Sequence, residues 1–176
     1  MTVAQRFTTE FIDFEDRLRI STELPGNQVA VLWVTRRLLD RLVSHLAGLL
    51  ERETATAPVP EVQQSFAQQA AQVTHAQQSQ EQPQPPVTPQ QAQTVQEWLV
   101  REVDLTPGQQ GVSVRFRGQS ADQVVELGMP ALLLRQWLGI VHGQYRRAQW
   151  PLDAWPDWMN EDKTTTITPG DAAVIH

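Results

Sequence analysis

Hydrophobic residues are most concentrated near the N-terminus, in residues 28–51, where two patterns follow each other. Six apolar or β-favouring residues, Val29–Val34, are typical of a strand that is buried on both faces. Leucine and valine then recur at steps of three and four residues, which predicts an amphipathic helix. Thr35 lies between the two patterns, and its hydroxyl can accept a hydrogen bond from the first helical turn. The sequence therefore predicts a strand that leads directly into a helix.

Two weaker strand patterns precede this unit. Residues 11–14 are a short, mostly apolar segment, and residues 17–21 alternate between polar and apolar side chains. Residues 24–27, Leu-Pro-Gly-Asn, predict a type II turn because Pro fixes φ at the second position and Gly permits a positive φ at the third. Residues 1–54 are therefore predicted to form a β-meander followed by a helix.

Glutamine and proline dominate residues 55–96. Four apolar residues in this insertion keep helical spacing and predict a weak helix over about residues 61–78: Val62, Phe66, Ala70 and Val73. Residues 80–89 contain one apolar side chain besides proline, Val87, and are predicted to be an extended linker. Thr88 and Pro89 have the residue types of a helix cap and a first helical position, so a further short helix is expected there. Its buried stripe would be Ala92, Val95, Trp98 and Leu99.

A second β region follows in residues 97–149. Strands are predicted at 101–105, 112–117 and 122–127, and the cleanest alternation is in the second of them. Pro130 then leads into a strongly apolar helix, residues 131–147. The two strand-and-helix units match in outline at an offset of about 94 residues. Either a duplication explains the match, or two units of the same type look alike because they pack in the same way.

The predicted fold class is α+β: two antiparallel β-meander-plus-helix units form one domain. The units are residues 1–54 and 97–149, joined by the Gln/Pro-rich insertion of residues 55–96. Residues 150–176 contain a Trp-Pro strip followed by a polar tail that we expect to be loose.

This order of elements is similar to that of the head domains of the end-joining scaffold and centriolar cartwheel proteins. The segments that carry the resemblance are residues 15–20 with 32–34, and residues 112–116 leading through 124–127 into the helix of 131–147. The resemblance implies a homodimer with a long coiled coil after the last helix. Trp150-Pro151 would stop that helix, so any coiled coil is expected to be missing or short, and no functional residues are transferred.

Composition narrows the classes of function. The formal net charge of −6 argues against general nucleic-acid binding, which normally needs a basic patch. Cysteine is absent, which excludes disulfides and thiolate chemistry. Without a long apolar run or an apolar N-terminal leader, a cytoplasmic location away from membranes is expected.

No recognisable catalytic, metal or cofactor motif occurs in the chain. The four histidines show none of the spacings of metal-binding motifs, and there is no glycine-rich phosphate loop and no nucleophile elbow. We therefore expect no cofactor, no metal and no enzymatic activity.

The Trp-Pro strip of residues 150–159 is the most unusual feature. It holds three of the six tryptophans, Trp150, Trp155 and Trp158, spaced by prolines. Such aromatic segments occur at interface hot spots, so these residues are candidate contacts, together with Trp137 and Tyr145 of the preceding helix. Alternatively, the strip folds back and closes the helical face of its own domain.

A second candidate cluster is electrostatic. Arg36 and Arg37 lie in the first turn of a predicted helix, where the helix dipole disfavours cations. Glu15 or Asp16 of the neighbouring meander would be suitable partners, either in a structural ion-pair cluster or in a partner-binding surface.

The function predicted from the sequence is a non-enzymatic interaction or scaffolding module that self-associates or binds another protein. The exposed part of the helix 131–147 and the Trp-Pro strip are its expected contact surfaces. The alternative is a nucleic-acid accessory protein that uses a local arginine patch: Arg115, Arg117, Arg146 and Arg147. A third hypothesis is an enzyme whose site the sequence does not reveal.

Overall fold

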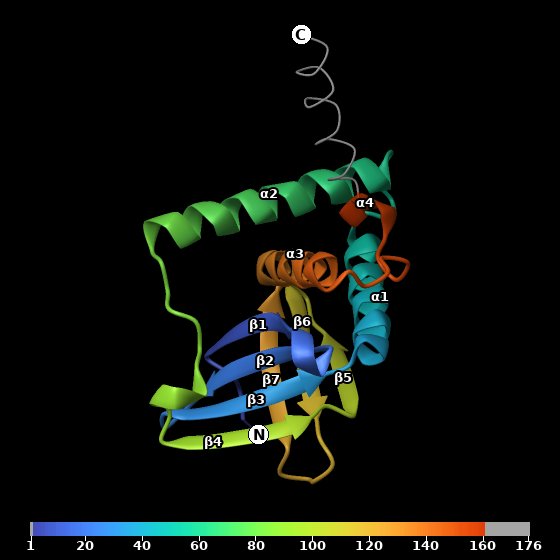
Figure 1. Ribbon diagram of the computed structural model, residues 1–176. Helices are drawn as coiled ribbons and strands as arrows, with labels where there is room; N and C mark the ends of the chain where they lie inside the picture. Colours follow the sequence, from blue (N-terminus) through green and yellow to red (C-terminus); the bar gives the residue numbers. More distant parts are fainter. Residues whose placement is uncertain (1, 161–176) are drawn as a thin grey trace.

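The computed structural model describes residues 2–160 (Figure 1). The strands are β1 (Arg6–Ile12), β2 (Arg17–Leu24), β3 (Gln28–Val34), β4 (Thr94–Leu99), β5 (Glu102–Pro107), β6 (Gly111–Arg117) and β7 (Val124–Pro130). The α-helices are α1 (Arg36–Glu53), α2 (Pro60–Glu81), α3 (Ala131–Ala148) and α4 (Asp157–Asn160). Two single-turn 3₁₀ helices, η1 (Asp13–Glu15) and η2 (Pro89–Gln91), complete the described elements. The polar tail from residue 161 lies outside the described residues.

The strands form two sheets, and the α+β class is confirmed. One sheet has the order β1-β2-β3-β4 and the other β5-β6-β7. β4 runs parallel to β3, whereas every other strand pair is antiparallel. The predicted antiparallel meander of residues 1–54 is present as β1–β3, but the unpredicted strand β4 joins it in parallel, so the first sheet is mixed. Three strands and a helix occur twice, as β1–β3 with α1 and β5–β7 with α3, but this shared outline alone does not show a duplication.

The two sheets are joined where the chain passes from one to the other. After β4, the amide of Val100 donates to the carbonyl of Trp33 at 2.9 Å, and the next amide, of Arg101, donates to Arg117 in the other sheet at 2.8 Å. Near the N-terminus, Ala4 donates to Glu126 of β7 at 2.9 Å, and Gln5 donates to Glu23 of β2 at 2.8 Å. These hydrogen bonds connect the two sheets directly.

Helices α1 and α3 cover the core. α3 lies between the sheets and α2, while α1 runs along one side (Figure 1). The predicted cap of α1 is confirmed, since the amide of Leu38 donates to Thr35 Oγ1 at 3.4 Å. α3 is covered on several sides, and its fully buried residues include Trp137, Leu138 and Tyr145. Among the described residues, no helix has the length and apolar character needed to cross a membrane.

Two local predictions are wrong. The helix expected after Thr88 is a single 3₁₀ turn followed by β4, and the Thr88 side chain makes no capping hydrogen bond. Trp98 is buried while Val95 and Leu99 are exposed, which is the alternation of a strand. The first strand covers Arg6–Ile12 rather than residues 11–14, where the chain instead turns through η1.

Candidate interaction surfaces

The Trp-Pro strip packs against its own domain. Trp150, Trp155 and Trp158 are all buried. Tyr145 of α3 is the centre of the contact, with edge-to-face ring pairs to Trp150 at 5.1 Å and to Trp155 at 5.2 Å. Trp150 also meets Phe11 of β1 at 5.3 Å. The strip therefore closes the end of the domain where α3 meets β1.

Four of the five candidate aromatic residues donate a hydrogen bond within the chain, whereas the buried indole N–H of Trp155 has no hydrogen-bond partner among the described residues. The indole N–H of Trp150 donates to Asp16 at 2.9 Å, and that of Trp158 donates to Glu51 at 3.0 Å. The hydroxyl of Tyr145 donates to Asp40 at 2.7 Å, and burial, followed by this hydrogen bond, raises the pKa of the tyrosine well above its usual value. The remaining candidate, Trp137, donates from its indole N–H to Thr9 Oγ1 at 2.9 Å. All five predicted contact residues are thus internal in a single chain: Trp137, Tyr145, Trp150, Trp155 and Trp158.

The predicted ion-pair cluster does not form as expected. Glu15 pairs with Arg17 at 3.9 Å, and Asp16 accepts the Trp150 indole N–H. Within residues 2–160, no ion pair joins Arg36 or Arg37 to either acid. Both arginines are exposed at the start of α1, so water screens their charges and a carboxylate partner is not required.

The four arginines of the alternative patch lie on two elements. Arg115 pairs with Glu126 at 3.3 Å, and Arg117 pairs with Asp104 at 2.8 Å. The pKa of Glu126 is lowered, first by a hydrogen bond from Ser113 and then by Arg115. The other two, Arg146 and Arg147, lie in the last turn of α3, where the helix dipole favours cations. The β6 pair is therefore already matched by carboxylates of its own sheet.

Helix α2 exposes apolar side chains and buries polar ones, which is the reverse of an ordinary surface helix. Its outer side exposes Phe66 by 69%, Val73 by 56% and Val62 by 48%. Its buried residues are Gln64, Gln68 and Ala71. An amphipathic helix normally turns its apolar stripe to the core. The apolar stripe that we recognised by its spacing in the sequence thus faces outward, and we call these residues with Val59 the α2 stripe.

Amide hydrogen bonds hold α2 on its polar side. Gln64 donates to the carbonyl of Leu50 at 2.5 Å, and its side-chain oxygen accepts from Arg135 at 2.8 Å. Gln68 donates to the carbonyl of Arg135 at 2.7 Å. From α3, Gln136 donates back to the carbonyl of Ala71 at 3.4 Å. These glutamines account for the inward polar face, and nothing in the composition of the insertion showed which glutamines would be buried.

No family model, curated protein or solved structure matches the chain. Its function is therefore argued from its own geometry. Within the described residues, no group of three or more histidine, aspartate or glutamate side chains is arranged to hold a metal ion. The α2 stripe is a feature that the packing of the described residues does not explain.

Proposed function

We propose that the protein is a non-enzymatic interaction module that self-associates through the α2 stripe. The observation that carries the proposal is the exposure of Phe66, Val62 and Val73 on one side of a helix whose opposite side is polar and buried. Isolated exposed apolar residues are ordinary, but a row along one helix side is typical of a contact surface. With the exposed Ala70 between Phe66 and Val73, residues 59, 62, 66, 70 and 73 follow the three- and four-residue spacing of helix-pairing seams.

The distribution of charge favours a second copy of the chain as the partner that binds the α2 stripe. The chain carries a formal net charge of −6, so two copies repel each other at long range. Helix α2, however, carries only two formally charged residues, Glu61 and Glu81, and neither belongs to the α2 stripe. A symmetric contact places the same patch on both partners, which suits an apolar, nearly uncharged helix side. A strongly charged partner would instead lose hydration on this surface without gaining ion pairs.

The area of the α2 surface indicates how strong the self-association should be. Helix α2 has 22 residues and is therefore about 33 Å long. With a width of about 10 Å, it covers roughly 330 Å² in projection, below the roughly 800 Å² that each partner contributes to a standard interface. A contact through α2 alone is thus expected to be weak and to depend on protein concentration.

The terminal helix is less suited to this role. The resemblance to dimeric head domains would place self-association at α3 and a coiled coil beyond it. In this chain α3 ends at Ala148, with Gln149 in the left-handed conformation, and much of its surface is covered by the sheets, α2 and the Trp-Pro strip. The α2 stripe, by contrast, is exposed along the outer side of its helix.

The test is the molar mass of the protein over a range of concentrations, with Phe66→Gln as the perturbation. Phe66 is 69% exposed, and burying that surface in a dimer would stabilise the contact by about 1–2 kcal/mol per chain. A two-fold symmetric dimer buries Phe66 of both chains, so the contribution is doubled. We therefore expect the dimer dissociation constant to rise roughly 30- to 1,000-fold. Light scattering or sedimentation velocity measures it, from the mass of one chain, 19.9 kDa, towards twice that value.

Phe14→Gln is the matched control. Phe14 is 86% exposed in η1, so the same chemical change occurs on a different surface. The wild type and Phe14→Gln should associate alike, whereas Phe66→Gln should remain monomeric at concentrations where they dimerise. A wild type that stays monomeric up to the highest soluble concentration, or dimers unaffected by Phe66→Gln, would exclude this function.

A further inference from the structure

The outer face of the four-stranded sheet is unusually apolar for a surface layer. Register places Val29 beside Val95 and Trp33 beside Leu99 on the side away from the core. An antiparallel meander with one solvated face normally shows polar side chains there. On β1 and β2 that rule holds, since Arg6 pairs with Glu23 at 2.9 Å. The apolar part is therefore confined to β3 and β4.

A segment of the chain itself already lies on part of this face. Residues 82–93, which we call the strap, connect α2 to β4 and contain four prolines, Pro83, Pro85, Pro86 and Pro89. Val87 is 94% buried and packs with Val29 and Val31 of β3. The φ and ψ angles of Thr88 and Ala92 are extended. The strap is thus an uncharged, proline-rich segment that is extended on both sides of the single turn η2 and has one buried side chain.

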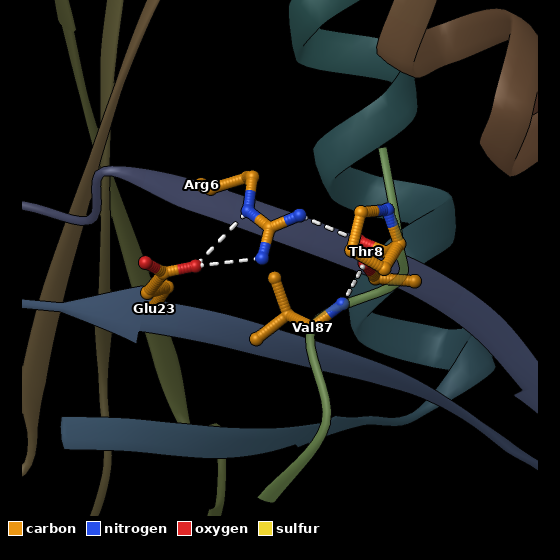
Figure 2. Close-up of polar contacts among 5 residues, drawn as sticks. Arg6, Thr8, Glu23 and Val87 are labelled. Carbon is orange, nitrogen blue, oxygen red and sulfur yellow. Dashed lines mark hydrogen bonds and ion pairs between the residues drawn. The ribbon is translucent and has the colours of Figure 1, made fainter. Parts of the chain in front are cut away.

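Two hydrogen bonds hold the strap beside β1 (Figure 2). Arg6 donates to the carbonyl of Pro85 at 2.5 Å while its other nitrogens bind Glu23. The amide of Val87 donates to Thr8 Oγ1 at 2.9 Å. Both hydrogen bonds use the strap backbone, and the apolar contacts of the strap come from Val87 and the half-buried Ala92. Proline-rich ligands are bound in this way elsewhere, through backbone hydrogen bonds and shallow apolar pockets.

The strap leaves the rest of the apolar face uncovered. Val95 is 45% exposed and Leu99 is 37% exposed. Trp33 is half-buried, with its indole N–H donating to Glu97 at 2.7 Å and the Arg19 guanidinium above its ring at 6.0 Å. An aromatic ring beside aliphatic side chains is the usual lining of a groove for polyproline-type segments.

We propose that the outer face of the β1–β4 sheet is a docking surface, which we call the groove, for an extended, proline-rich protein segment, and that the strap is its occupant within the chain. The groove consists of Val29, Val31 and Trp33, with Arg6 and Thr8 as the residues that bind the ligand backbone. The strap competes with an external ligand at high effective concentration, because it is attached to the same chain. A partner of this kind would therefore bind only after it displaces Val87.

The test uses a fluorescent peptide of residues 82–93 and the full-length protein. Val87→Asp removes the buried side chain of the strap, so the groove should open and the dissociation constant for the peptide should fall at least tenfold relative to the wild type. Tenfold corresponds to about 1.4 kcal/mol. The same peptide carrying the Val87→Asp change is the control and should not bind. Fluorescence anisotropy measures all three.

Val87→Ser serves as a second variant if Val87→Asp fails to fold, as judged by circular dichroism. Adding Thr8→Ala to the open variant should weaken peptide binding several-fold, because the ligand amide loses its acceptor. Equal binding by the wild type and a folded open variant, or no binding by the open variant, would overturn the proposal. Phe66→Gln should bind the peptide as the wild type does, so failure of self-association and failure of the groove can be told apart.

Discussion

Replacing Trp150 by alanine tests whether the Trp-Pro strip is an internal lid of the domain. Its ring is buried between Phe11 and Tyr145, with edge-to-face distances of 5.3 Å and 5.1 Å. Removing a buried tryptophan costs about 3–5 kcal/mol through lost apolar burial and the cavity left behind. The hydrogen bond to Asp16 adds little, because that carboxylate is exposed and water can replace the indole.

The expected loss is a large part of the stability of an ordinary domain, which is about 5–15 kcal/mol. With a urea slope of about 2 kcal/mol per molar, the unfolding midpoint should fall by roughly 1.5–2.5 M. Far-ultraviolet circular dichroism follows the transition without depending on the tryptophan that is removed.

Trp33→Ala is the control of the same residue type. Trp33 is half-buried on the outer face of the sheet, so its removal should cost about 1–2 kcal/mol. If Trp150→Ala lowers the free energy of unfolding by less than Trp33→Ala does, the strip does not close the domain and our account of it is refuted. In that case its tryptophans would again be candidates for contact with a partner.

Further predictions concern a close strand contact and alkaline pH. Gly111→Ala should destabilise the protein by about 1–3 kcal/mol, because an added Cβ would lie 2.7 Å from the Cα of Pro130. Gly128→Ala on the same strand pair is the control, since its Cβ would have open space and should be tolerated. Thermal melting compares the two variants. Tyr145 is the single tyrosine, and its pKa is raised in the folded state by burial and then by Asp40. Its stabilising contribution is complete below the unfolded value of about 10 and decreases as the pH rises above it, so the wild type should lose stability more steeply than Tyr145→Phe, with tyrosinate absorbance appearing only as the chain unfolds.

The elements that the sequence predicted correctly are those in which local pattern and burial agree. The β3–α1 unit has a continuous apolar strand, a threonine cap and a leucine stripe, and all three occur as predicted. Strand β6 buries Val112, Val114 and Phe116 in strict alternation. In these segments the environment of each residue depends mostly on its neighbours along the chain, so the period of the pattern is sufficient.

Elements whose environment is set by distant residues were missed. The inward side of β1 includes Thr9, which interrupts the apolar alternation and is buried because it accepts the indole N–H of Trp137 from α3. Strand β4 pairs with β3, which is more than sixty residues earlier in the chain. Six residues can follow either a helical or a strand pattern, and only this pairing decides between them. The polar partners of Trp150 and Trp158 are equally remote.

Helix α2 is the element in which the apolar pattern and the fold disagree most. Burying Phe66 and Val73 against the core would contribute about 3–5 kcal/mol, whereas each glutamine hydrogen bond on the opposite side contributes about 1 kcal/mol net. A chain that functioned alone would gain little by keeping the apolar side in water. Disagreement between local pattern and fold is expected at functional sites. There, a partner can bury the apolar side chains that folding leaves in water. A polar residue at Phe66 should consequently reduce association while leaving the unfolding free energy of the monomer nearly unchanged, and the contrast between these two measurements separates an interaction surface from a core position.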